Sequence, residues 1–306
     1  MVNVTWGHVV RNNALDFRER EFSTPKDPDT FRVMVIGDSL TWGVGLGEEE
    51  RYSHLLEKKL RAAVGKTRNV QVLNFGRPAA ATVDLNKIVT SQIQVVKPDL
   101  VVVGFCVNDP QTREESYAVE LEKYQWLFRW MRSLGRLGFH RTANVLNLRL
   151  DQLLRNVRLV PSYNESLDRA YQVKSAEWQG FTAALRGMYD TAMAYTGRAP
   201  VFIMLLQGSA DYNVSSPYVD CMLHWTRLAG AAAREAGYRV LETETAFKKE
   251  GFRNRWVTPW DGHPDATCNR HYANILFEEV IKDVQAPVAT QTPDRLKVTT
   301  RRVIDE

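Results

Sequence analysis

The side chain with the clearest chemical potential is the hydroxyl of Ser39, which lies in the tetrapeptide Gly37-Asp38-Ser39-Leu40. The tetrapeptide directly follows an apolar run over residues 31–36, which has the composition of a short buried strand. Ser39 is therefore expected on the turn from a strand to a helix, with its hydroxyl accessible and its backbone N–H directed outward. This placement suits a nucleophile whose transition state is stabilised by backbone donors.

A base for this serine could come from Asp261-Gly262-His263-Pro264, near the C-terminal end of the chain. An imidazole side chain is suited to accepting a hydroxyl proton near neutral pH, so His263 is the candidate base. The carboxylate of Asp261 could fix the ring tautomer and stabilise the imidazolium. Gly262 would permit a tight bend between them. An ordinary turn explains this short pattern about equally well.

Two further segments could supply an oxyanion hole beside the Ser39 N–H. Asn74-Phe75-Gly76 and Gly104-Phe105-Cys106-Val107-Asn108-Asp109 each end an apolar run. The Gly76 N–H and the Asn108 side-chain amide are the candidate donors, and losing one such donor typically costs about 2.7–4 kcal/mol of transition-state stabilisation. A turn glycine and a helix cap are the structural alternatives.

The elements that must position these residues alternate between strand and helix. Strands are predicted at 33–36, 70–74, 100–105, 201–206 and 238–241, and helices at 48–64, 84–96, 217–236 and 270–281. Such alternation predicts a parallel sheet covered by helices, with ligands bound outside the carboxyl ends of its strands. Ser39, Gly76 and Asn108 all follow such ends.

Taken in order, the four motifs resemble the blocks of the SGNH hydrolases, also called the GDSL esterase/lipase family. The resemblance covers about residues 31–282. It implies a flavodoxin-like three-layer α/β/α sandwich with a central parallel sheet of about five strands. It also implies Ser39 as nucleophile, His263 as base, Asp261 as its partner and an oxyanion hole from Ser39, Gly76 and Asn108. It implies no metal and no organic cofactor.

Three positions depart from the family pattern. The spacing Asp261-x-His263 is one residue shorter than the common Asp-x-x-His, which leaves open which carboxylate orients the imidazole. Asp265 stands where Asn is common, and Cys268-Asn269 replaces a frequent Gly-His pair.

Other chemistries fit the sequence less well. Gly43, Gly45 and Gly47 follow the first strand but lack the dinucleotide fingerprint, because Glu48 occupies its last position. His271 is a rival base, although its place inside a predicted helix favours a packing role. Cys106 and Cys268 are expected to be small buried thiols.

Composition limits the class and the compartment. The 306 residues carry a net charge of +4, which is too small to indicate nucleic acid, and no apolar stretch approaches the roughly 20 residues of a membrane span. The N-terminus lacks the features of a secretory signal, so the chain as written is expected in the cytoplasm. A periplasmic or secreted protein is the alternative if an upstream portion is missing. Three cysteines without metal-ligand spacing fit a reducing compartment.

We expect an N-terminal arm at 1–30, one hydrolase domain at 31–285 with a helical insertion or cap at 111–198, and a disordered tail at 286–306. Within the insertion, residues 125–160 contain seven arginines and a single acid, Asp151. The favoured interpretation is an amphipathic helical pair whose apolar face, including Trp126 and Trp130, packs on the sheet. The alternatives are a cap for an acidic glycan or an anionic acyl donor, or a peripheral membrane contact.

The predicted function is a serine esterase that hydrolyses small O-acyl esters through an acyl-enzyme. Carbohydrate O-acetyl or short-chain acyl esters are the first expectation and lipid esters the second. An O-acyltransferase acting on a polysaccharide would use the same residues. A non-catalytic glycan-binding or assembly protein on this fold is the alternative from another class. The oligomeric state is left open.

Overall fold

A parallel five-stranded sheet forms the centre of the protein. The computed structural model describes residues 2–5, 7–112, 122–136, 146, 149–150, 153–208, 210–251, 255–258 and 261–286. The strands of the sheet are β3 (Thr30–Gly37), β4 (Asn69–Gly76), β5 (Leu100–Phe105), β6 (Val201–Met204) and β7 (Arg239–Leu241). Their order is β4-β3-β5-β6-β7, and every neighbouring pair is parallel. This is the flavodoxin-like order, so the predicted fold class is confirmed.

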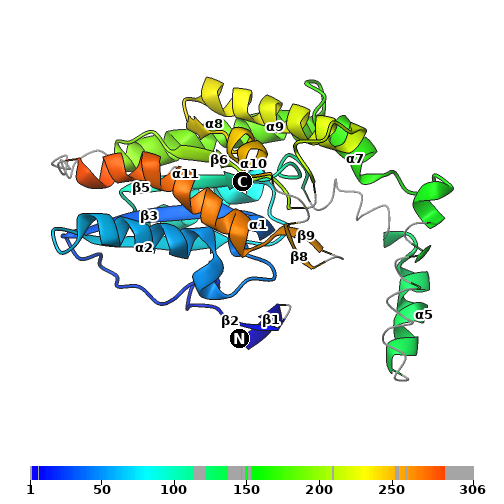
Figure 1. The fold of residues 1–306 in the computed structure, drawn as a ribbon, viewed down its shortest axis with the longest axis horizontal. Helices are drawn as coiled ribbons and strands as arrows, with labels where there is room; N and C mark the ends of the chain where they lie inside the picture. The colour runs from blue at the N-terminus through cyan, green and yellow to red at the C-terminus, as the bar shows by residue number, and fades with distance from the viewer. Residues whose placement is uncertain are drawn as a thin grey trace, which may run out of the picture.

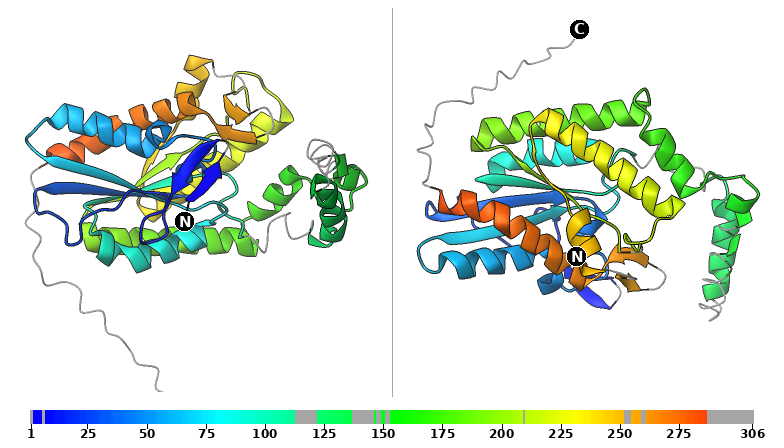
Figure 2. Two further views of the ribbon diagram at one scale, coloured as in Figure 1. Left: turned by 90° about the horizontal axis from the view of Figure 1, so that it is seen from below. Right: turned by 45° about the horizontal axis from the view of Figure 1, so that its top comes forward.

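Helices cover both faces of this sheet, as Figures 1 and 2 show. On one face α2 (Tyr52–Val64) packs against α11 (Ala266–Gln285), and on the other α3 (Thr82–Val96) and α9 (Pro217–Ala236) each pack against α8 (Ala176–Thr196). Strands β3 and β5 are buried along their whole length, which explains their nearly continuous apolar sequences. The shorter helical elements are α1 (Ser39–Trp42), η1 (Glu48–Glu50), α5 (Gln125–Arg136), α7 (Tyr163–Ala170) and α10 (Glu244–Glu250).

Two local predictions were wrong. The helix predicted at 48–64 is interrupted, because η1 is a 3₁₀ turn and Arg51 is extended before α2 begins. The segment around His263 is not a loop with a bend at Gly262. It is β9 (Asp261–Pro264), which pairs antiparallel with β8 (Trp256–Thr258). Two strands this short carry too little periodicity to be recognised in a sequence.

The N-terminal arm belongs to the body of the domain. After the hairpin of β1 (Val2–Thr5) and β2 (His8–Arg11), Phe17 packs in the main core and the charged Arg18 and Glu19 are buried. The Arg18 guanidinium donates to the carbonyls of Gly43 and Leu46, both at 2.6 Å, and of Trp42 at 3.3 Å. The arm thereby holds the chain that leaves α1.

Two neighbouring contacts complete this attachment. The Glu19 carboxylate accepts a hydrogen bond from the Asn74 N–H at 2.8 Å, and Arg51 donates to the Arg18 carbonyl at 2.5 Å. Burial is the main reason that the pKa of Arg18 falls to about 10, which still leaves the group charged at neutral pH. The arm is thus bound to the loop after α1 and to strand β4.

Two observations concern the rest of the chain. Within the described ranges, every helix is too short or too polar to cross a bilayer. The tail predicted to be disordered at 286–306 lies outside the described residues, apart from Ala286.

Replacing Arg18 with Ala should destabilise the protein by about 3 kcal/mol, because three buried carbonyls lose a charged donor at once. Urea unfolding of Arg18→Ala measures this loss, and Arg11→Ala, at an exposed position of β2, is the matched control. An Arg18→Ala variant within about 0.5 kcal/mol of the wild type, the range usual for surface changes, would contradict this role for the arm.

Candidate active site

Ser39 is the first residue of α1, which begins just after strand β3 ends. The Asp38 carboxylate caps this helix by accepting a hydrogen bond from the Leu40 N–H at 2.8 Å. The helix is one turn long because Gly43 adopts a left-handed conformation, with φ of 83°, at its end. Ser39 therefore occupies the predicted turn between a strand and a helix.

Three glycines let this short helix sit directly on the sheet. Gly76 and Gly104 lie on either side of Gly37 in the strand register. A Cβ atom on Gly37 would lie 2.1 Å from Thr41 Oγ1, and one on Gly104 would lie 2.5 Å from the same atom. A Cβ atom on Gly76 would lie 2.4 Å from the backbone nitrogen of Trp42. Larger residues would push α1, and with it Ser39, away from the strand ends.

The structure brings Ser39, His263 and Asp261 together. His263 Nε2 lies 2.8 Å from Ser39 Oγ, and His263 Nδ1 forms a short contact with Asp261 Oδ1. Because the carboxylate can only accept, the proton is assigned to Nδ1, and Nε2 is then the acceptor for the serine hydroxyl. The same Asp261 oxygen accepts from the His263 N–H at 3.1 Å. This is the arrangement that general-base activation of a serine requires.

The departures from the family pattern have structural explanations. With only Gly262 between them, Asp261 still reaches the His263 ring, because the short strand β9 holds both side chains. Asp265 caps α11 by accepting from the N–H groups of Thr267 and Cys268 at 2.8 and 3.0 Å. Asn269 accepts a hydrogen bond from the Tyr52 N–H at 3.0 Å, and this contact ties α11 to α2.

The prediction that Gly76 supplies an oxyanion donor needs correction. Its N–H donates to the Asn74 side chain at 2.9 Å, and its backbone lies against α1. The glycine is needed for close packing, and a sequence cannot distinguish this role from that of a donor. Asn108, by contrast, lines a cavity together with Ser39 and His263.

That cavity has a volume of about 340 Å³ and includes two residues that the sequence motifs did not indicate. Tyr163 begins α7, and Gln207 follows β6. The Gln207 amide lies 3.4 Å from the Tyr163 hydroxyl and accepts from the Tyr218 hydroxyl at 3.0 Å. The position of Gln207 at the carboxyl end of a strand could have identified it as a site residue, whereas no sequence feature identified Tyr163. The cavity is lined by Ser39, Leu40, Asn108, Tyr163, Gln207, Asp261, Gly262 and His263.

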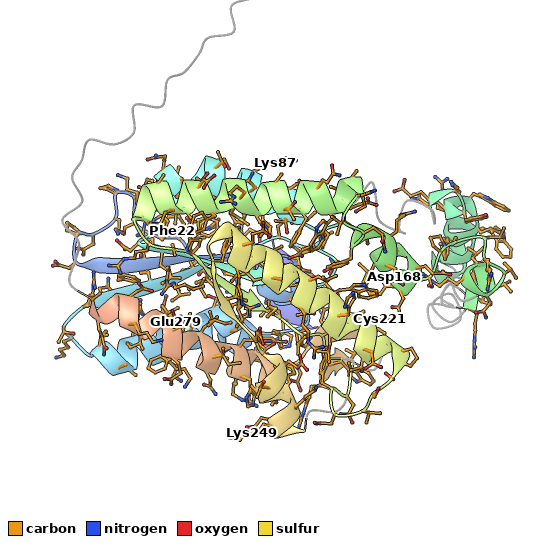
Figure 3. The ribbon with its side chains drawn as sticks, turned by 90° about the horizontal axis from the view of Figure 1, so that it is seen from above. Phe22, Lys87, Asp168, Cys221, Lys249 and Glu279 are labelled. Atoms are coloured by element: carbon orange, nitrogen blue, oxygen red, sulfur yellow. The ribbon has the colours of Figure 1, made fainter. Side chains whose placement is uncertain are left out.

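The Asn108 turn and α7 are fastened to each other. Gln111 donates to the Ser166 hydroxyl at 2.8 Å, and the Tyr171 hydroxyl donates to the Val107 carbonyl at 2.9 Å. Figure 3 shows Asp168 on α7, where it accepts a hydrogen bond from the Trp225 indole of α9 at 3.1 Å. These contacts fix the side of the cavity that Tyr163 contributes.

The alternative base His271 and the two cysteines Cys106 and Cys268 are not suited to the chemistry of this site. His271 is within α11 and does not line the cavity. Burial raises the pKa of both Cys106 and Cys268, which disfavours their thiolates. Among the described residues, no three His, Cys, Asp or Glu side chains are grouped as a metal site would require.

Two buried carboxyl groups lie beneath the site. Asp109 accepts from the Cys106 N–H at 3.0 Å and closes the turn that carries Asn108, while its Oδ1 is buried without a partner among the described residues. Burial, with a smaller contribution from the Asp38 charge, raises the pKa of Asp109 well above its usual 3.8. Burial likewise raises the pKa of Asp38.

This burial predicts how stability depends on pH. Native Asp109 keeps its proton at pH values where the unfolded chain has released it, so the free energy of unfolding should fall as pH rises above about 4. Asp109→Asn keeps an acceptor for the Cys106 N–H but cannot ionise, so its free energy of unfolding should fall less between pH 5 and pH 8. Urea unfolding at both values tests this, and equal pH dependence in the two proteins would refute it.

Comparison with known proteins agrees with this geometry. Residues 35–271 match the GDSL-like lipase/acylhydrolase family. The chain therefore belongs to that family, and the resemblance inferred from the four motifs is confirmed. Membership places the protein among hydrolases that act on ester bonds. No curated protein sequence matches the chain.

Several solved structures are similar in fold. LAE5, an α/β hydrolase from the metagenome of Lake Arreo in Spain, is 17% identical with a TM-score of 0.51, over 84% of this chain and 97% of that one. Axe2, an acetylxylan esterase from Geobacillus stearothermophilus, is 16% identical with a TM-score of 0.46, over 84% and 95%. The acetyl xylan esterase AlAXEase is 13% identical with a TM-score of 0.48, over 82% and 100%.

Proposed function

We propose that the protein is a serine esterase that cleaves small O-acyl esters through a covalent acyl-enzyme. Ser39 Oγ attacks the ester carbonyl while His263 Nε2 takes its proton, and His263 returns that proton to the departing alcohol oxygen. Water then attacks the acyl-serine with the same histidine as base, which releases the acid and restores the hydroxyl. Asp261 holds the Nδ1–H tautomer and stabilises the imidazolium.

The observation that carries this proposal is the 2.8 Å contact between Ser39 Oγ and His263 Nε2, in a chain of the acylhydrolase family. Asn108 and the Ser39 N–H are the proposed donors to the oxyanion. Gly76 is left out of this set because its N–H is engaged with Asn74. The cavity beside Ser39 would receive the acyl group or the alcohol.

The size and lining of that cavity favour a small, polar substrate. About 340 Å³ lies at the lower end of the range of ligand sites, and Asn108, Tyr163 and Gln207 add amide and hydroxyl groups to its wall. Such groups suit the hydroxyls of a sugar better than an acyl chain of many carbons. A carbohydrate O-acetyl ester is therefore the proposed substrate class. An O-acyltransferase would differ only in the acceptor of the acyl group.

Ser39→Ala and His263→Ala should each lower kcat for p-nitrophenyl acetate by at least about 10³-fold, because the two residues act as one unit. Steady-state kinetics measure this, and His271→Ala is the matched histidine control, with kcat within twofold of the wild type. An unchanged kcat in Ser39→Ala would remove Ser39 from the mechanism.

The acyl preference is a separate prediction. Because the cavity is small, kcat/KM for p-nitrophenyl acetate should exceed that for the octanoate by at least about tenfold. Assays of both esters below their solubility limits provide the comparison, with acetylated xylo-oligosaccharides as glycan substrates. A preference for octanoate would favour the lipid-ester alternative, and acetyl transfer to an added sugar without acetate release would favour a transferase.

A further inference from the structure

Part of the insertion forms a small unit apart from the sandwich. Three buried apolar side chains, Leu150, Leu154 and Val160, are packed by three partly buried ones on the segment leading into α5 and on α5 itself, namely Tyr124, Leu127 and Phe128. Figures 1 and 3 show α5 standing away from the layers of the fold. The expectation that its apolar face packs on the sheet was therefore wrong.

The outward side of α5 is unusual for a helix facing water. Residues of an α-helix are about 100° apart, so the mean direction of Leu127 and Phe128 differs from that of Trp126 and Trp130 by about 130°. These two indoles are 61% and 64% exposed, and Arg129, which lies between them in the sequence, is exposed too. Helices on a core normally place charged or polar residues here, whereas this one presents its largest apolar rings.

The second segment also combines buried and exposed apolar side chains. Leu150 and Leu154 enter the shared cluster, while Leu153 and Val157 are 56% and 53% exposed. Leu159 is a further exposed leucine, at 55%. We call Trp126, Trp130, Leu153, Val157 and Leu159 the outer apolar surface. These five side chains are exposed to solvent, as the apolar surfaces that bind a partner are.

The positive charge of this region indicates which kind of partner would bind such a surface. Residues 125–160 contain seven arginines and only Asp151 as an acid, and Arg129, Arg149 and Arg158 are exposed in the structure. A second copy of the chain would bring two such positive units together. An anionic bilayer instead offers phosphates to the arginines, a headgroup region to the indoles and an acyl boundary to the leucines and valine.

We propose that this unit docks the protein on the surface of an anionic lipid bilayer through the outer apolar surface and the exposed Arg129, Arg149 and Arg158. The contact is peripheral. Val160 of the unit and Tyr163, on the wall of the candidate active site, are three residues apart in the sequence. The inference does not depend on the esterase activity.

Sedimentation with large vesicles tests the proposal. The wild type should bind vesicles of 30% phosphatidylglycerol in phosphatidylcholine at 50 mM salt and bind them weakly at 500 mM salt. It should not bind vesicles of pure phosphatidylcholine. Trp126→Ala/Trp130→Ala should weaken binding at least about tenfold, because two large apolar rings lose their burial. Arg129→Gln/Arg158→Gln should weaken it about fivefold for each charge removed.

Val173→Ala is the matched control, because this valine is 75% exposed but lies outside the unit. Its binding should equal that of the wild type. Thermal unfolding establishes whether each variant is folded. If the tryptophan variant does not fold, the binding of the charge variant alone tests the proposal. The proposal is overturned if the wild type ignores anionic vesicles at low salt, or if both variants bind as well as it does. The proposal would also be overturned, in favour of a second copy of the chain, if the wild type formed dimers but did not bind vesicles, and if the tryptophan variant did not form dimers.

Discussion

The contact between Ser39 Oγ and His263 Nε2 joins residues 224 positions apart, and much of the fold serves to bring them within 2.8 Å. Ser39 is fixed by the end of β3 and by the Asp38 cap. His263 is fixed by β9, and α11 follows it directly. The Asn269 contact with the Tyr52 N–H then locks α11 against α2. Together these attachments hold the two groups at the hydrogen-bond distance that proton transfer requires.

The attachments rely on buried polar groups as well as on apolar packing. Arg18, Glu19 and Arg51 are removed from water, which is unfavourable unless each finds partners. Arg18 donates to the loop after α1, Glu19 accepts from β4, and Arg51 donates to the Arg18 carbonyl, so the N-terminal arm stabilises the backbone that follows Ser39. Asp109 likewise stabilises the turn that carries Asn108, although this requires a carboxyl group to be buried. Stability and the geometry of the site are coupled through these residues.

Much of this arrangement could be predicted from the sequence. The buried strands are continuous apolar runs. The pairing of Asp261 with His263 could be predicted too, although the strand β9 that holds both residues could not. The role of Gly76 could not be predicted, because a glycine needed for close packing looks the same in sequence as one needed as a donor. Tyr163 belongs to no motif, and only the packing of α7 on the Asn108 turn brings it to the cavity. The exposed tryptophans of α5 show the same limit, since helical spacing identifies a face but not what covers it.

The central claim is that Ser39 is an activated nucleophile, and a covalent probe tests it most directly. Intact-protein mass spectrometry after treatment with a fluorophosphonate should show one added phosphonyl group, and peptide mapping should place it on Ser39. Labelling should be lost in His263→Ala, because the hydroxyl then has no base. An unmodified wild type, or a group mapped to another residue, would contradict the account.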